Sequence, residues 1–66
     1  MPKYPQIKVK LSGQDGNAFF ILGVVTRALK NSMVVPADEI QEFLTEAKSG
    51  DYHKLLATCM EWVDVT

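Results

Sequence analysis

The run from residue 15 to residue 29, DGNAFFILGVVTRAL, is the longest nearly uninterrupted apolar stretch in this chain, and any fold must cover it. Asp15 and Asn17 are residue types that accept hydrogen bonds from the free N–H groups at a helix start, and Gly16 allows a tight turn beside them. The pattern predicts a helix that begins at about Gly16 or Asn17. Two neighbouring apolar faces follow at helical spacing: Ala18, Leu22, Val25 and Leu29 on one, and Ile21, Val24 and Ala28 on the other.

The first half of this predicted helix is apolar almost all round, and such a helix must be covered on more than one side. The chain has only 66 residues, and a domain of this size buries only about 60% of its unfolded surface. A second copy of the chain could complete the cover, so we expect a homo-oligomer. The candidate contacts for this self-association are Phe19, Phe20, Gly23 and Val24.

Gly23 stands in the middle of the predicted helix, where glycine costs about 1 kcal/mol relative to alanine. Close approach by another backbone would offset this cost. The sequence leaves open whether that backbone belongs to the same chain or to a second subunit.

The remaining elements follow from local patterns. Ile7, Val9 and Leu11 alternate with lysines, which predicts a strand, and residues 1–6 before it read as an extended arm. Pro36 suits the first turn of a second helix, whose apolar positions are Ile40, Phe43, Leu44 and Ala47 and which Gly50 would stop. Asp51 is a plausible cap for a third helix with its apolar face at Tyr52, Leu55, Leu56, Cys59, Met60 and Val63.

Residues 62–65 have two interpretations, a short strand that pairs with residues 7–11 or a frayed helix end. The fold class predicted for the whole chain is therefore α+β. We expect one small, mostly helical domain spanning residues 1–66, with an N-terminal strand, three helices and, in the first interpretation, a short C-terminal strand.

Composition narrows the class of protein. The net charge of −1 argues against a nucleic-acid polymer as partner, and no apolar run is long enough to cross a membrane. The single Cys59 fits a reducing compartment, so we expect a soluble cytoplasmic protein. The charge is uneven, since residues 1–35 carry five cations and one acidic residue, whereas residues 36–66 carry two cations and seven acidic residues. The basic half could bind an anion.

The segment from Ser12 to Asn17 lies between the predicted strand and the long helix, where backbone N–H groups can gather around phosphate or carboxylate. It lacks the residues of a P-loop, and Asp15 would repel an anion. A plain turn with a helix cap explains the same residue types. The candidate ligand-binding residues are Lys8, Lys10, Ser12, Gly13, Gly16, Asn17 and Arg27.

Groups that could perform catalysis are few. His53 is the only histidine, and it is six positions from Cys59, so the two do not share a helix face as metal ligands would. Cys59 belongs to an apolar face and is expected to be buried and inert. The acidic residues Asp38, Glu39, Glu42 and Glu46 fit the wet face of a helix. We expect no metal, no cofactor and no enzymatic activity.

Two segments, IKVKLSGQDGNAFFILG and SGDYHKLLATCMEWVDV, resemble a family of small uncharacterised proteins found in bacteria and their phages. The shared pattern is a lysine-alternating strand, a DGNAF-x-ILG helix start, an acidic middle helix and an SGDY segment before the last helix. A basic residue often follows ILG in that family, whereas Val24 stands there in this chain, which argues against anion binding at that position.

The resemblance implies no catalytic residue. Its phage association favours small proteins that modulate the host, including anti-defence proteins. The first functional hypothesis is a homo-oligomer that sequesters an anionic small molecule such as a nucleotide signal. The alternative is a protein-interaction module or an inhibitor of a host protein, and an enzyme using His53 comes third.

Overall fold

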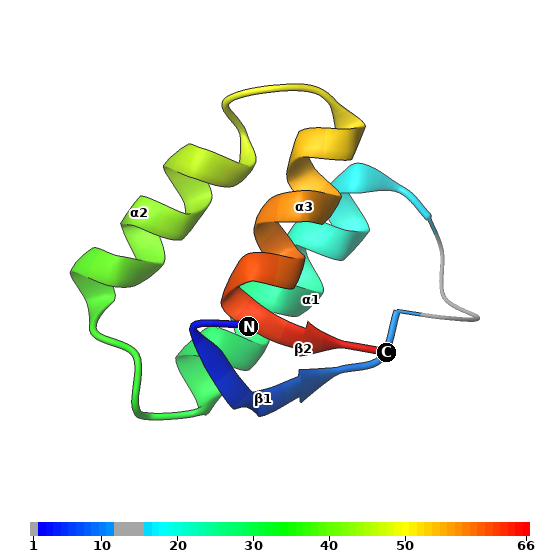
Figure 1. The fold of residues 1–66 in the computed structure, drawn as a ribbon. Coiled ribbons are helices and arrows are strands. Elements are labelled where there is room, and N and C mark those ends of the chain that lie inside the picture. The colour runs from blue at the N-terminus through cyan, green and yellow to red at the C-terminus, as the bar shows by residue number, and fades with distance from the viewer. Residues whose placement is uncertain (1, 12–15) are drawn as a thin grey trace.

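The computed structural model describes residues 2–11 and 16–66, and it contains two strands and three helices (Figure 1). The elements are, in chain order, β1 (Tyr4–Val9), α1 (Ala18–Asn31), α2 (Ala37–Ala47), α3 (Tyr52–Trp62) and β2 (Val63–Val65). This order confirms the predicted α+β fold. The strand begins at Tyr4 rather than at Ile7, so residues 4–6 of the predicted extended arm belong to β1.

The two strands lie side by side and form a parallel two-stranded sheet (Figure 1). Lys8 pairs with Asp64 and Val9 with Val65. The pairing continues beyond β2, because the Thr66 N–H donates to the Val9 carbonyl at 2.9 Å and the Leu11 N–H donates to the Thr66 carbonyl at 2.8 Å. The strand interpretation is therefore confirmed for residues 63–65, whereas Trp62 is the last residue of α3, which passes directly into β2.

Helix α1 starts where the sequence predicted. The Asn17 side-chain oxygen accepts the backbone N–H of Phe19 at 2.8 Å and that of Phe20 at 3.4 Å, so it satisfies two donors that the first turn would otherwise leave unpaired. The helix ends before Met33, whose φ of 63° places it in the left-handed region. Glycine normally occupies such a position after a helix.

The other two helices differ in how they begin. Helix α2 starts after Pro36 without a side-chain cap, and Asp38 and Glu39 in its first turn complement the positive end of the helix dipole. It ends at Ala47, before the glycine that was predicted to stop it. Helix α3 has the predicted cap, since Asp51 Oδ1 accepts the backbone N–H of Lys54 at 3.0 Å.

The core lies where the three helices meet the sheet. Helix α1 contributes one stripe, Ile21, Val25 and Leu29, spaced four residues apart. Trp62 sits at the centre of an aromatic group, with its ring 5.6 Å from that of Phe43 edge-on and 6.3 Å from that of Tyr4 in a stacked arrangement. The other buried hydrophobic residues are Ile7, Val9, Ile40, Ala47, Leu55, Cys59 and Val63.

Tyr4 also joins the sheet to α2. Its hydroxyl donates to Glu39 Oε1 at 2.6 Å, and the Lys3 ammonium lies 3.1 Å from the same oxygen. These two hydrogen bonds favour the charged carboxylate and hold the pKa of Glu39 below its usual value, whereas the bond to Glu39 raises the pKa of Tyr4. Within the described residues, no helix is long and apolar enough to cross a membrane.

Candidate functional site

The described residues leave one side of α1 exposed. Phe19 keeps 85% of its surface exposed and Phe20 keeps 39%, although both belong to the apolar half of the helix. The side of α1 that faces away from the core is hereafter the α1 outer face, and its exposed residues are Phe19, Phe20, Gly23, Arg27, Lys30 and Asn31. Its first half is aromatic and its second half is cationic.

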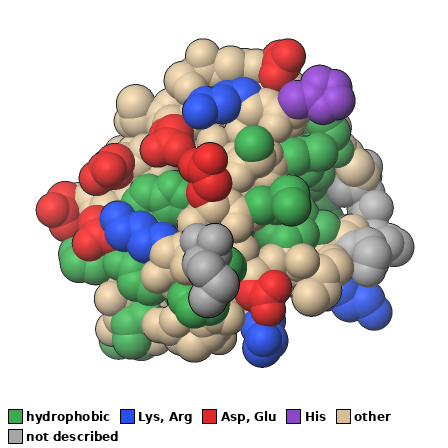
Figure 2. All heavy atoms as spheres, viewed as in Figure 1, with side chains coloured by type: hydrophobic (Ala, Val, Ile, Leu, Met, Phe, Trp, Pro, Cys, Tyr) green, Lys and Arg blue, Asp and Glu red, His purple; other side chains and the backbone are tan. Residues whose placement is uncertain are grey.

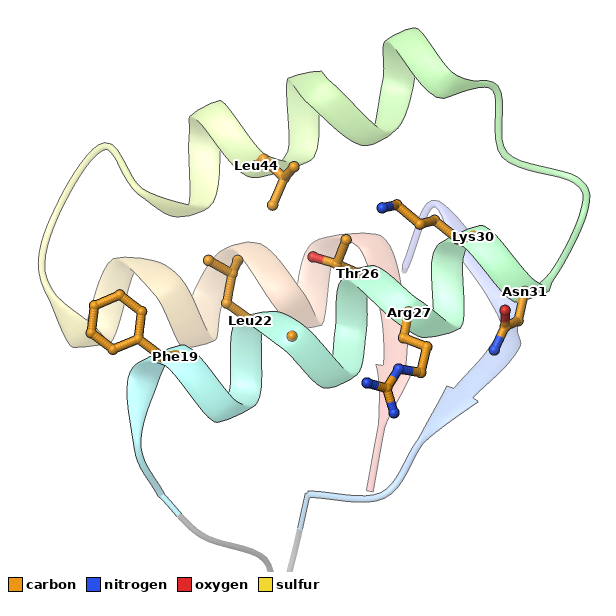
Figure 3. Close-up of a pocket in the computed structure, with 8 residues that line it drawn as sticks. Phe19, Leu22, Thr26, Arg27, Lys30, Asn31 and Leu44 are labelled. Carbon is orange, nitrogen blue, oxygen red and sulfur yellow. The ribbon is translucent and has the colours of Figure 1, made fainter.

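A groove of about 410 Å³ runs along α1 beside α2 and is hereafter the α1–α2 groove. Phe19 lies at one end of it. In the second half of α1, Lys30 points towards α2, whereas Arg27 points away from α2 (Figure 3). Leu44 points from α2 towards α1 (Figure 3). The remaining lining residues are Leu22, Gly23, Thr26 and Asn31. An aromatic ring, an aliphatic middle and two cations therefore share one surface hollow.

Thr26 adds a polar atom to this groove. Its Oγ1 is buried and has no hydrogen-bond partner among the described residues. A buried hydroxyl without a partner costs roughly 1–3 kcal/mol. The unpaired hydroxyl therefore lowers the free energy of unfolding of the isolated chain. It lies between the apolar and the cationic parts of the groove.

Gly23 lies at an exposed position on α1. A Cβ atom built at this position meets none of the described residues within 4 Å. Of the two alternatives for a close approach, the described residues therefore offer none within the chain, and an approach by a second subunit stays a prediction. Val24, predicted beside Gly23 as a self-association contact, is instead partly buried and packs against the core.

A second hollow, of about 320 Å³, continues from the start of α1 towards the start of α3. It shares Phe19 and Leu22 with the α1–α2 groove and ends at Lys48 and Tyr52. The Tyr52 hydroxyl donates to the Gly16 carbonyl at 2.7 Å, which ties α3 to the segment before α1. Phe19 thus lines both hollows.

The predicted ligand-binding residues are not gathered into one site. Lys8 lies 2.9 Å from Asp64, so its charge is partly neutralised. It shares a third hollow with Asn31, which also lines the α1–α2 groove. Lys10 is exposed. Asn17 and Arg27 are at opposite ends of α1, about 15 Å apart along the helix axis.

Of the predicted anion-binding segment before α1, the structure describes only Gly16 and Asn17. Ser12 and Gly13 lie outside the described residues. The Gly16 carbonyl accepts the Tyr52 hydroxyl, and the Asn17 side chain accepts the N–H groups of Phe19 and Phe20 in the first turn of α1, which are then not free to bind an anion. Arg27, by contrast, lines the α1–α2 groove.

Sequence reasoning did not assign Phe19, Lys30 or Leu44 to a ligand site. Lys30 follows Arg27 by three positions, which places both cations on neighbouring parts of one helix face. That spacing is a local signal that could have been used. Leu44 comes from another helix, and no local signal indicates that it faces Phe19 and Lys30.

The remaining chemical groups do not form a reactive cluster. Cys59 is fully buried, as predicted, and burial raises the pKa of its thiol to about 11. His53 is exposed. Among the described residues no three His, Cys, Asp or Glu side chains are close enough to hold a metal ion. Several acidic side chains lie on the surface over α2, where Figure 2 shows them as separate groups.

Comparisons of the chain with protein-family models, with curated proteins and with solved structures found no match.

Proposed function

We propose that this chain is a non-enzymatic binding protein that self-associates and sequesters an anionic small molecule with an aromatic part, such as a nucleotide signal. The observation that carries the proposal is the α1–α2 groove, which places an exposed phenylalanine and two cations on one hollow surface. An anti-defence role against host nucleotide signals would follow from the resemblance to small phage proteins.

Each part of the groove suits one part of such a ligand. An aromatic base can stack on the Phe19 ring, and base–aromatic stacking is worth roughly 1–3 kcal/mol per base. The Arg27 guanidinium is a planar fork that matches two phosphate oxygens, and Lys30 adds a second charge. Leu22 and Leu44 provide apolar contact between these ends.

The test is calorimetric titration of the protein with a panel of linear and cyclic nucleotides. We expect heat and a raised melting temperature for at least one of them. Lys30→Gln removes one of the two cations and should weaken that binding by at least about tenfold, because a hydrogen bond to a charged group is worth roughly 1.5–3 kcal/mol.

Lys54→Gln is the matched control. Lys54 is an exposed lysine on α3 and does not line the groove, so this variant should bind like the unmodified protein. Absence of heat across the whole panel, or equal losses in both variants, would overturn the proposal.

A protein-interaction module is a second candidate, and Met33 favours it. This residue is held at a φ of 63°, where a side chain costs about 1–2 kcal/mol, yet its side chain is 89% exposed. The adjacent Val34 is 55% exposed. An apolar side chain displayed at an energetic cost is a candidate contact for another protein.

Met33→Gly separates the two roles of this position. Relief of the backbone should raise the free energy of unfolding by roughly 0.5–1 kcal/mol, after allowance for the more flexible unfolded chain. If Met33 contacts a partner protein, the same variant should lose a stoichiometric partner that the unmodified chain captures from a host lysate. Equal capture by both proteins would argue against this second candidate.

A further inference from the structure

We propose that a second copy of this chain covers the α1 outer face, in a two-fold symmetric dimer whose two α1 helices cross antiparallel at Gly23. This inference rests on the self-association in the proposed function and specifies its geometry. In this dimer the Phe19 ring of each copy contacts the partner's Arg27, so the same contact forms twice.

The first step of the argument is the glycine. Helix α1 has a glycine at a solvent-facing position where a Cβ atom would meet none of the described residues, so nothing within the described chain requires it. Glycine is unfavourable in a helix interior. Where two helices cross, however, a missing side chain lets the backbones approach closely. Gly23 therefore marks the crossing point on this face.

The second step is the position of the charged and aromatic residues relative to that point. Phe19 and Arg27 lie on the same side of α1, about 6 Å before and about 6 Å after Gly23 along the helix axis. A two-fold axis through Gly23 places each residue that precedes Gly23 opposite the residue that follows Gly23 by the same distance in the other copy. It therefore places each exposed ring opposite the guanidinium of the other copy.

The contact formed in this way is electrostatically favourable. The face of a phenylalanine ring carries the negative part of its quadrupole and attracts a guanidinium. The same chain already shows such a contact, with the Lys3 ammonium 4.5 Å from the centre of the Trp62 ring. Antiparallel α1 helices also place opposite ends of their dipoles together.

Other arrangements of two copies fit less well. Parallel α1 helices would bring Arg27 and Lys30 against the same cations of the partner copy. The acidic face of α2 could meet the cationic half of α1, but Phe19 would then lie against carboxylates. That contact also joins two different surfaces, so it extends into chains of molecules unless it closes into a ring. The antiparallel α1 pair avoids both problems.

The proposed dimer contact overlaps the α1–α2 groove. Phe19, Gly23 and Arg27 belong to both, whereas Leu22, Thr26 and Leu44 line the groove on the side towards α2. Each groove therefore lies at the boundary between the two copies, and a ligand bound there would also touch the dimer contact.

The main experiment is sedimentation equilibrium without nucleotide, over a range of protein concentrations. We expect the unmodified chain to form a dimer and Gly23→Leu to raise the dimer dissociation constant by at least about tenfold. Gly23→Ala should weaken the dimer while raising the melting temperature of the dilute monomer, because alanine favours the helix. A monomeric unmodified chain, or a Gly23→Leu variant that dimerises normally, would overturn the proposal.

A charge exchange tests the pairing itself. Phe19→Lys places two cations together across the proposed interface, and Arg27→Glu removes the cation, so each should weaken the dimer by at least about tenfold. The double variant should return to within a few-fold of the unmodified chain through a new ion pair. Positions 19 and 27 are about 12 Å apart within one helix, so only a contact between copies can produce this rescue.

Loss without rescue would overturn the antiparallel pairing even if a dimer forms. The assay contains no nucleotide, so its outcome is independent of the titrations above. A dimer that binds no nucleotide would contradict the ligand proposal alone, and a nucleotide-binding monomer would contradict this inference alone.

Discussion

Cys59 shows how a single buried residue makes stability depend on pH. The thiol is fully buried on α3, and desolvation raises its pKa from the ordinary value of 9.0 to about 11. At alkaline pH the unfolded chain loses this proton first, because its thiol has the lower pKa. The contribution of the Cys59 thiol to the free energy of unfolding is therefore complete below about pH 9, and it is lost as the pH rises towards 11.

We predict that the free energy of unfolding falls by up to about 1.4 kcal/mol per pH unit in this window from Cys59 alone. Urea denaturation at several pH values between 8 and 11 would measure it. Cys59→Ala is the comparison, since it lacks the thiol and keeps every other alkaline group, including Tyr4. The difference in stability between the two proteins should narrow above pH 9, and a constant difference would contradict the prediction.

Single residues were also where the sequence predicted most accurately. The caps Asn17 and Asp51 depend on bonds to residues two or three positions away, so their residue types and neighbours were enough. The role of Gly23 could not be predicted in this way. Whether another backbone approaches a glycine depends on elements that are distant in sequence or belong to another molecule.

At the scale of the element, Phe43 and Phe19 lie on different helices, and we expect their replacement to affect the free energy of unfolding very differently. Phe43 on α2 is fully buried against Trp62, whereas Phe19 on α1 is mostly exposed. We predict that Phe43→Ala lowers the free energy of unfolding by about 3–5 kcal/mol, through lost burial and the cavity left behind. Phe19→Ala should change it by no more than about 0.5 kcal/mol in the dilute monomer.

Chemical denaturation at low protein concentration would measure both changes. Phe43→Ala is expected to leave a chain of this size partly unfolded, so its loss is best obtained with a stabilising osmolyte present in all samples. Comparable losses in the two variants would show that Phe19 is buried within a single chain.

The helices also show why the buried face of α1 could not be chosen from the sequence. In α2, polar residues separate the apolar positions and leave one answer. In α3 the predicted face was partly wrong, because Tyr52 and Met60 are exposed whereas Thr58 and Trp62 are buried. In α1 both candidate faces are apolar, and the structure buries a stripe drawn from both, with Ile21 from one and Val25 and Leu29 from the other. That choice depends on where α2, α3 and β1 lie.

At the scale of the whole molecule, the element order and class were predictable, but contacts between distant segments were not. The alternation of Ile7 and Val9 with lysine indicated a strand, yet the strand begins at Tyr4, which pairs with Val63 of β2, a residue far away in the sequence. The candidate site could likewise be predicted only in part, because it too depends on contacts between distant segments. Arg27 was predicted, whereas the groove exists because Leu44 of α2 approaches α1.

The parallel pairing of β1 with β2 has a consequence for synthesis of the protein. β1 emerges from the ribosome well before its partner strand, because all three helices lie between the two strands in the chain. Until residues 62–65 are free, β1 has no strand to pair with, and the core lacks Trp62 and the fully buried Val63. Segments made earlier can form helices, but they cannot close the core around missing residues. Folding of the nascent chain is therefore completed only after translation of the domain is nearly over, and in the meantime its apolar helix is exposed to chaperones and to other nascent copies.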